Sequence, residues 1–346
     1  MPRLTVMTIH DDGKQDVESR LLSQIAAYHD TALAYACVKL ALPETMGTEA
    51  WTAERLAAAL GLSAPHLKRL LSGLVTLGLI EERGEAFALT RAGQALKPGA
   101  PFHLREKLLI VVEQYWQPWA NLAGAVREGR PAFDLVFGET VGDWRRHHSD
   151  HGAVFESYLE SETFTHAAPI VEALDFTGVA TIAEIGGGHG ALLAAVLLAQ
   201  PHLHGILMDA AHKLSGARVY LHSHGLTERV ALAKGDATAE VAVGADLYLL
   251  KAVLQQHDDA TAKAILTNLR RAMPDGARLV IIERLMPEKA ADDPATIMLD
   301  LHMMTITGGK TRTRIEMEAL AAEAGLAIAG VSKTVGGLAM IECLPR

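Results

Sequence analysis

The fold of this 346-residue chain is decided by the stretch Ala183-Glu184-Ile185-Gly186-Gly187-Gly188-His189-Gly190. The apolar run 181–185 leads into it and the apolar segment from Ala191 follows it, which is typical of a turn from a strand into a helix. Glycines at such a turn let the backbone approach a ligand that larger side chains would exclude. The spacing of Gly186, Gly188 and Ala191 also matches the fingerprint of NAD-binding domains, so the motif alone leaves the ligand open.

Strands and helices alternate from residue 180 to the end of the chain. Apolar runs predict strands at 181–185, 205–208, 229–233, 246–250 and 278–283, with helical segments between them and a closing hairpin of 327–333 and 338–343. This alternation predicts an α/β fold with a Rossmann-like, mostly parallel sheet that carries helices on both faces. A closing antiparallel hairpin is unusual for dinucleotide-binding folds.

Three acidic residues stand at successive strand ends, at Glu184, Asp209 and Asp236. A carboxylate just before the glycines suits an ammonium or sulfonium group better than a pyrophosphate, which it would repel. Asp209 is placed to accept hydrogen bonds from ribose hydroxyls, a role that NAD enzymes share, and Asp236 can accept one from an adenine amine. Each acid alone is as readily a helix cap or a solvated loop residue. The three together favour S-adenosylmethionine, whose sulfonium and amino groups are cationic.

The first half of the chain has helical periodicity. We expect helices over 17–40, from Thr52, and from Ala64 to about Leu77 with Ser63 as its N-cap, then two short strands around Gly84. Helix, turn, helix and hairpin form a winged-helix pattern, which raises DNA binding as one function. However, residues 54–97 hold six basic and four acidic residues, and the formal net charge of the chain is −9. Without a basic footprint, we predict no nucleic-acid partner and a packing and dimerisation role instead.

The overall composition is that of an ordinary globular protein, with 49% apolar and 21% charged residues. The two cysteines exclude a disulfide framework. The N-terminus lacks the apolar core of a signal peptide, and the apolar run 191–199 is too short to span a membrane. We therefore expect a cytoplasmic protein with no membrane partner. Histidine clusters such as 147–151 lack the partners of a designed site, so we predict no metal.

Taken together, these segments resemble the class I, S-adenosylmethionine-dependent small-molecule O-methyltransferases of the plant caffeate type, whose bacterial relatives act in polyketide and antibiotic biosynthesis. The resemblance rests on runs at 175–178, 184–190, 235–236, 244–251, 300–304 and 308–313. It implies a winged-helix dimerisation domain at 1–100, a helical linker at 101–175 that contributes to the acceptor pocket, and a cofactor-binding methyltransferase domain at 176–346. It also implies a homodimer that methylates a small aromatic hydroxyl compound.

The family's cofactor site carries over onto Glu184, Gly186, Gly187, Gly188, Asp209, Asp236 and Lys251. Ala237 replaces a larger residue that usually covers the adenine. An apolar acceptor pocket would draw on Trp116, Trp119, Phe155, Leu159, Met303 and Met304. A free small molecule and a group bound to an acyl carrier protein both remain open as acceptors.

The position of the family's catalytic base is changed. Members of the family carry a histidine four residues after the lysine, whereas this chain has Gln255, which cannot take a proton. Glu283, one of the two acids beside that base, is present, and Thr311 replaces the other.

Three hypotheses follow from the missing histidine. In the first, the enzyme relies on proximity and on an acceptor with an acidic hydroxyl. In the second, another residue such as His302 is the base. In the third, the fold has lost methyl transfer and performs another reaction. His257 is closer in sequence to Gln255 but occupies a position that the family uses for packing. A winged-helix regulator that senses a ligand is the alternative outside enzymes.

Overall fold

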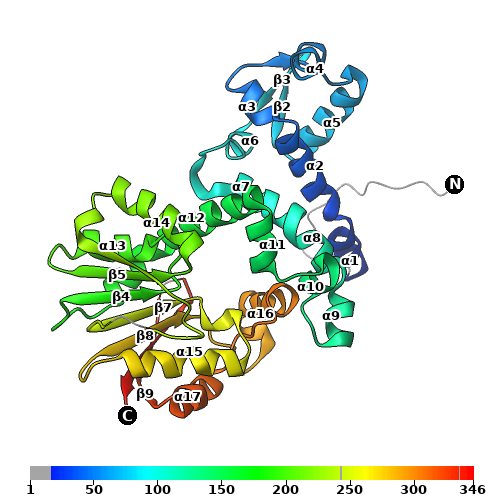
Figure 1. Cartoon of the computed structure of the whole chain (residues 1–346). Helices are drawn as coiled ribbons and strands as arrows, with labels where there is room; N and C mark the ends of the chain where they lie inside the picture. Colours follow the sequence, from blue (N-terminus) through cyan, green and yellow to red (C-terminus); the bar gives the residue numbers. More distant parts are fainter. Residues whose placement is uncertain (1–16, 242–243, 335) are drawn as a thin grey trace. The chain divides into compact units, whose positions relative to one another are not determined.

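The computed structural model describes residues 17–241, 244–334 and 336–346 (Figure 1). Contacts divide the chain into two compact units, Met1–Val112 and Glu113–Arg346. The division falls inside the segment 101–175, which the resemblance predicts to be a helical linker. Residues 1–16, which carry the expectation about a signal peptide, lie outside the described part.

The first unit has the winged-helix order. Its elements are α1 (Val17–Ala26), α2 (Tyr28–Lys39), α3 (Leu42–Met46), β1 (Trp51–Thr52), α4 (Ala53–Leu60), α5 (Ala64–Thr76), β2 (Ile80–Arg83), β3 (Ala86–Leu89), α6 (Arg91–Gln94), the 3-10 turn η1 (Pro101–His103) and α7 (Leu104–Ile110). The three strands form an antiparallel sheet in the order β1-β3-β2. Leu56 of α4 and Leu67, Leu71 and Leu74 of α5 share one buried core with Phe87, because apolar residues three or four apart line one helix face.

Two local expectations were wrong. The single helix expected over 17–40 is two helices, because the amides of Ala27 and Asp30 bond to carbonyls three residues back and tighten the chain there. Ser63 stands before α5 but does not cap it, since its hydroxyl pairs with His66 Nδ1 at 2.8 Å.

The second unit contains a seven-stranded sheet in the order β6-β5-β4-β7-β8-β10-β9. The strands are β4 (Thr181–Ile185), β5 (His204–Asp209), β6 (Val230–Lys234), β7 (Leu247–Lys251), β8 (Arg278–Glu283), β9 (Leu326–Lys333) and β10 (Ala339–Pro345). The first five pair in parallel, and β10 runs antiparallel to both β8 and β9. The Rossmann-like sheet with a closing antiparallel hairpin is therefore confirmed, with ends within one or two residues of those expected.

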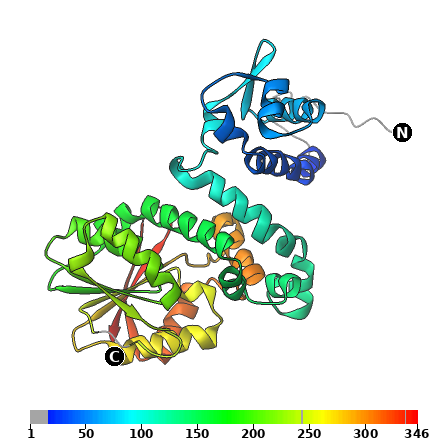
Figure 2. The ribbon, with the colours of Figure 1, turned by 45° about the horizontal axis from the view of Figure 1, so that its top comes forward.

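Helices cover both faces of this sheet (Figures 1 and 2). They are α12 (Ser149–Ala173), α13 (Ala191–Ala199) and α14 (Ala211–Ser223) on one face and α15 (Asp259–Ala272) and α17 (Arg314–Glu323) on the other. Ile182 of β4 packs in the core with α13, whereas Ala183 and Ile185 pack in the core with α15. Burial on both sides explains why the central strands are continuously apolar.

The remaining elements of the second unit are helical. They are η2 (Val111–Tyr115), which spans the boundary, α8 (Trp116–Ala120), α9 (Leu122–Glu128), α10 (Ala132–Phe137), α11 (Val141–His147), the 3-10 turns η3 (Thr227–Arg229), η4 (Leu254–Gln256) and η5 (Ala290–Asp292), and α16 (Pro294–Ile306). The chain reverses its direction across the sheet at β4, with β5 and β6 on one side and β7 and β8 on the other. Ligands of open α/β sheets bind at the carboxyl ends of the strands beside such a reversal.

Candidate active site

The turn from β4 into α13 accepts only glycine at two positions. Gly186 has a φ of +72°, and a Cβ placed on Gly187 would lie 2.4 Å from Cδ of Glu184. The amide of Gly186 donates to the carbonyl of Met208 in the neighbouring strand at 2.8 Å. The backbone therefore passes close to the strand ends, where a ligand can approach it.

Glu184 is a buried carboxyl, 2% exposed, directly below this turn. Its Oε2 accepts a hydrogen bond at 3.0 Å from the amide of Leu193, in the first turn of α13. Burial raises the pKa of Glu184 to about 7, against the opposing effects of this hydrogen bond and of Lys251. A cationic ligand beside Glu184 would favour its ionised form.

Lys251 ends β7, the strand next to β4. Its Nζ donates to Oγ1 of Thr163 on α12 at 3.2 Å. Burial lowers the pKa of Lys251, and Glu184 and Glu162 oppose that shift. The structure thus brings Glu184 and Lys251 into one electrostatic group, as the resemblance implies.

Asp209 holds the glycine turn from the next strand. Its Oδ2 accepts from the amide of Gly188 at 2.8 Å, and its Oδ1 accepts from the amide of Ala210 at 2.7 Å. A carboxylate has about four acceptor positions, so further lone pairs remain for a hydroxyl donor.

Asp236 follows the strand beyond Asp209, and its Oδ1 accepts from both the amide and the hydroxyl of Thr238, at 2.9 and 2.7 Å. Ala237 packs against the core beside it. Acids at the ends of three neighbouring strands and a glycine cradle fit S-adenosylmethionine, because the carboxylates match its cationic groups and its ribose hydroxyls.

Gln255 lies in the short turn η4, 8% exposed. Its backbone amide donates to Oε1 of Glu283 at 3.0 Å. Burial raises the pKa of Glu283 to about 7, while the amides of Val253, Leu254 and Gln255 and the charge of Arg312 oppose the shift. Glu283 therefore supports the backbone of this turn.

The segment around Thr311 closes the same turn from the other side. Thr311 is 2% exposed, and its Oγ1 is the one fully buried side-chain oxygen or nitrogen without a partner in the described chain. Arg312, 1% exposed, donates to the carbonyls of Leu254 and His257 at 2.9 and 3.0 Å and to Oδ1 of Asp259 at 2.9 Å. The pKa of His257 is lowered, and burial is the largest cause of that shift.

His302 of α16 is surrounded by aromatic rings. Its Nδ1 accepts a hydrogen bond from the indole N–H of Trp119 at 3.2 Å, and its ring meets that of Tyr115 edge-on with 4.6 Å between centroids. Burial, with a smaller effect from the charge of Arg145, lowers the pKa of His302 to about 4. An indole only donates, so neutral His302 carries its proton on Nε2.

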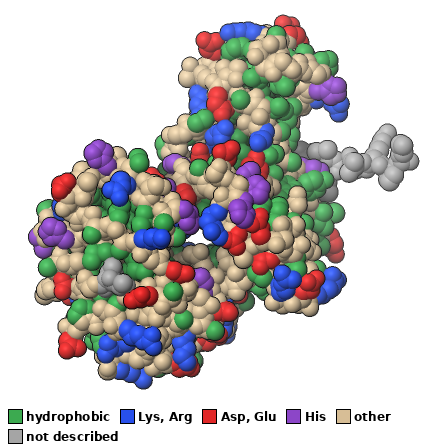
Figure 3. Space-filling view, in the orientation of Figure 1, with side chains coloured by type: hydrophobic (Ala, Val, Ile, Leu, Met, Phe, Trp, Pro, Cys, Tyr) green, Lys and Arg blue, Asp and Glu red, His purple; other side chains and the backbone are tan. Residues whose placement is uncertain are grey.

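The other expected pocket residues are placed as follows. Phe155 lies against Arg145, whose Cζ is 3.3 Å from the ring centroid. Met303 is buried at 8% exposure, Trp116 and Met304 are half-buried, and Leu159 is 38% exposed. In Figure 3 the surface is hollowed where Figure 1 shows α11 and α16 facing the strand ends.

Two further residues, Gln114 and Arg145, join this aromatic group through Tyr115 and were not expected from the sequence. Arg145 Nη2 donates to the hydroxyl of Tyr115 at 3.0 Å, and its Nε donates to Oε1 of Gln114 at 2.9 Å. Arg145 and Arg146 are neighbours of the same type, so the sequence carries no signal that separates them. Only their burial distinguishes the two arginines, since Arg145 is half-buried and Arg146 is exposed.

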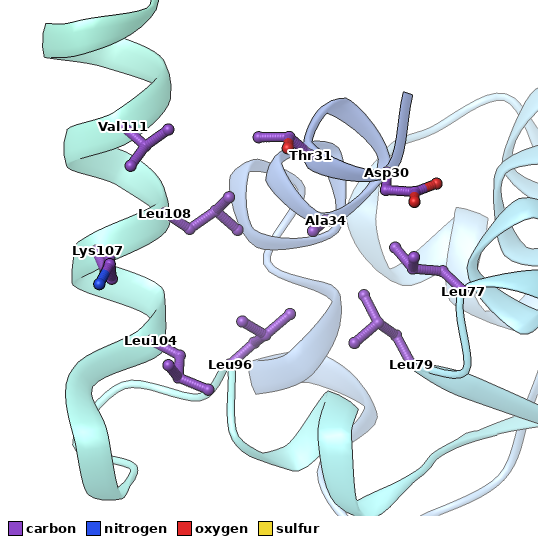
Figure 4. Close-up of a pocket in the computed structure, with 10 residues that line it drawn as sticks. All are labelled: Asp30, Thr31, Ala34, Leu77, Leu79, Leu96, Leu104, Lys107, Leu108 and Val111. Atoms are coloured by element: carbon purple, nitrogen blue, oxygen red, sulfur yellow. The ribbon is translucent and has the colours of Figure 1, made fainter. Parts of the chain in front are cut away.

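A separate pocket of about 480 Å³ lies inside the first unit (Figure 4). Asp30, Thr31, Ala34, Leu77, Leu79, Leu96, Leu104, Lys107, Leu108 and Val111 line it. Its lining is mostly aliphatic and includes none of the residues expected to bind the cofactor or the acceptor.

Comparison with known families decides the assignment. The family described as O-methyltransferase domain matches residues 119–327, and the O-methyltransferase dimerisation domain matches residues 22–98. The chain belongs to the O-methyltransferase family. This methyltransferase is 33% identical to the phenazine O-methyltransferase PhzM of Lysobacter antibioticus, over 96% of this chain and 98% of that protein. It is also 33% identical to the 8-amino-8-demethylriboflavin N,N-dimethyltransferase of Streptomyces davaonensis, over 89% of this chain and 90% of the relative.

Among solved structures, the methyltransferase resembles NcsB1, an O-methyltransferase from neocarzinostatin biosynthesis in complex with S-adenosylmethionine and 2-hydroxy-5-methyl naphthoic acid. The TM-score is 0.80 at 28% identity, with 91% of this chain and 96% of that chain covered. The cofactor of the methyltransferase is S-adenosylmethionine. No helix within the described residues is long and apolar enough to cross a membrane.

Proposed function

We propose that this methyltransferase acts on a hydroxyl of a free aromatic small molecule in secondary metabolism. The observation that carries the proposal is the ring cluster of Tyr115, Trp119 and His302, which offers flat surfaces in the unit that carries the cofactor cradle. Phenazine and naphthoic acid in the names of the relatives support a flat acceptor, and the free acid in the NcsB1 complex supports one without a carrier protein.

Bound S-adenosylmethionine supplies an electrophilic methyl group, and we assign its binding to Glu184, Gly186, Gly187, Gly188, Asp209, Asp236, Ala237 and Lys251. Asp209 accepts from hydroxyls of the cofactor while it holds the amide of Gly188. Glu184 balances positive charge below the glycine turn, where burial strengthens the electrostatic attraction.

We assign the proton of the acceptor hydroxyl to solvent water and not to a histidine base; the oxygen left behind takes the methyl group, and S-adenosylhomocysteine is the leaving group. Gln255 cannot accept a proton, and Glu283, at the end of β8, accepts hydrogen bonds from the backbone amides of the turn that carries Gln255. The lone pair on Nδ1 of His302 is engaged by Trp119, and Nε2 carries the proton of the neutral ring. His302 therefore donates a hydrogen bond to the acceptor. Catalysis rests on proximity, with an acceptor whose own substituents make its hydroxyl acidic.

The test is methylation of a panel of phenols and hydroxynaphthalenes of graded acidity, followed by mass spectrometry for the added methyl group. We expect the rate to rise with the acidity of the hydroxyl. Gln255→His restores the family base beside Glu283 and should give a modest gain only with weakly acidic phenols. Absence of methylation across the panel, in a protein that binds S-adenosylhomocysteine, would favour the hypothesis that methyl transfer has been lost.

Cofactor contacts are tested separately by calorimetry with S-adenosylhomocysteine. Asp209→Ala removes a charged acceptor and should weaken binding by roughly 1.5–3 kcal/mol, the scale of a charge-assisted hydrogen bond. Asp209→Asn keeps the shape of the side chain and separates loss of charge from distortion of the turn. Glu228→Ala, an exposed acid in the same unit, is the control. Unchanged affinity in Asp209→Ala would reject the assignment of this residue.

A further inference from the structure

Arg145 is held in one orientation by three neighbours. Its Nε donates to Oε1 of Gln114 at 2.9 Å, its Nη2 donates to the hydroxyl of Tyr115 at 3.0 Å, and the ring of Phe155 lies 3.3 Å from its Cζ. Gln114 is itself 1% exposed and donates to the carbonyl of His151 at 3.1 Å. The guanidinium is thus positioned by a buried amide and two aromatic rings.

The charge of Arg145 is not matched by a carboxylate in the described part of the chain. Several other arginines there have an ion pair: Arg146 with Asp143, Arg312 with Asp259, and Arg278 with both Asp175 and Glu342. Arg229 is half-buried without one, but it donates four hydrogen bonds to the backbone carbonyls of Leu197, Gln200 and Leu203, whereas Arg145 donates only two. Glu156 acts on Arg145 only at longer range, and its own carboxylate lies 3.8 Å from Nζ of Lys213. A half-buried cation with neither a counter-ion nor a full set of hydrogen-bond acceptors is costly to desolvate, and an anionic ligand would offset that cost.

The unused donors of Arg145 remain within reach of a ligand. A guanidinium has five N–H groups, and two of them are used by Gln114 and Tyr115. Nη1 of Arg145 makes none of these hydrogen bonds. In the described chain, Oγ1 of Thr311 is the one side-chain oxygen or nitrogen that is both fully buried and unpaired. Nη1 of Arg145 is therefore not fully buried, so solvent or a bound molecule can reach it. Tyr115 links this guanidinium directly to the ring of His302.

We infer that Arg145 binds a carboxylate on the aromatic acceptor, so that the enzyme selects hydroxylated aromatic acids over their neutral analogues. The inference rests on the proposed function, because it places the acceptor against the ring cluster of Tyr115, Trp119 and His302. A guanidinium forms two parallel hydrogen bonds with a carboxylate, which sets the orientation of the ring as well as its affinity. Arg145 is thus a specificity-determining residue.

The test compares 3-hydroxy-2-naphthoate with 3-hydroxy-2-naphthamide, which has the same shape without the charge. Binding to the full-length protein saturated with S-adenosylhomocysteine is followed by quenching of tryptophan fluorescence. We expect the acid to bind at least about 10-fold more tightly than the amide, as for a charge-assisted pair. Arg145→Met should remove this preference and leave the affinity for the amide within about 3-fold. Arg145→Lys should keep part of the preference because it keeps the charge.

Arg146→Met is the matched control, since Arg146 is the exposed neighbour on the same helix, and it should keep the full preference. A wild type that binds both compounds equally, or neither, contradicts the inference, as does an Arg145→Met variant that still prefers the acid. Retained binding of S-adenosylhomocysteine and an unchanged melting temperature show that the variant is folded. Preference for the acid without methyl transfer would leave Arg145 as the carboxylate anchor and reject only the proposed activity.

Discussion

At the scale of residues, His302 accepts a hydrogen bond from Trp119 at Nδ1, and burial holds its pKa at about 4. A neutral ring with its proton on Nε2 can donate to the acceptor but cannot take a proton there. Glutamine also offers a side-chain donor, so His302→Gln should lower kcat by less than about 10-fold, against the roughly 10²–10⁴-fold that loss of a general base costs. The measurement is kcat as a function of pH with an acidic phenol. If the variant lost the acidic limb of the plot of kcat against pH, His302 would instead be identified as the base.

Glu283 makes the stability of the protein depend on pH. Its pKa rises from an ordinary 4.5 to about 7 in the folded state. Protonated Glu283 therefore adds to the free energy of unfolding below pH 4.5, and this stabilisation is lost as the pH rises towards 7. Glu283→Gln keeps an acceptor for the amide of Gln255 but does not titrate. Between pH 5 and pH 8 the free energy of unfolding should therefore fall by about 2–3 kcal/mol less in the variant than in the wild type.

Denaturant unfolding at four pH values in this range measures that difference. Glu184 shifts in the same direction but is present in both proteins, so it cancels in the comparison. His302 acts in the opposite sense, because its lowered pKa makes its contribution disappear as the pH falls from 6.5 to about 4. Equal slopes for wild type and variant would show that Glu283 is ionised throughout.

At the scale of elements, the turn between β4 and α13 depends on the absence of a side chain at Gly187. Gly187→Ala places a methyl group 2.4 Å from Cδ of Glu184, which must then move away from the amide of Leu193. We expect a loss of roughly 1–3 kcal/mol in stability, as for overpacking elsewhere, and weaker binding of S-adenosylhomocysteine. Thermal melting and calorimetry measure both effects.

The matched control is Gly142→Ala in α11, where the nearest atom to the new methyl group is Oγ1 of Thr140 at 3.9 Å. A helical glycine with open space should gain roughly 0.5–1 kcal/mol on this change, because alanine loses less conformational entropy on folding. If both variants behaved alike, the close approach at Gly187 would have no special importance.

At the scale of the whole molecule, the dimerisation domain at residues 22–98 and the apolar surface of α1 point to a homodimer. Leu21, Leu22 and Ile25 are each more than half exposed. We expect the combined substitution of these three by serine to give a monomer in size-exclusion chromatography with light scattering, because it removes apolar area from the interface. Val219→Ser, at 72% exposure on α14, should leave the dimer intact. A triple variant that is still dimeric would exclude α1 from the interface.

The sequence alone determined the features that depend on neighbouring residues. Apolar runs bounded by polar turns located all seven strands of the large sheet, since a strand buried on both faces must be apolar along its length. The glycines at 186–188 and the acids at three strand ends predicted one cofactor cradle, and the order of β4, β5 and β6 does bring these strand ends to one edge of the sheet. These signals depend on residues that are close in the sequence, so they can be recognised without the tertiary structure.

The tertiary structure decided everything that depends on contacts between distant segments. Trp119 and His302 are 183 residues apart, and only their hydrogen bond shows which nitrogen of the histidine carries the proton. Arg145 and Arg146 are identical in type, yet one is half-buried against Phe155 and the other pairs with Asp143. Charge state, tautomer and availability of a donor depend on burial and on hydrogen-bond partners. Folding sets both, and no periodicity in the sequence reveals them.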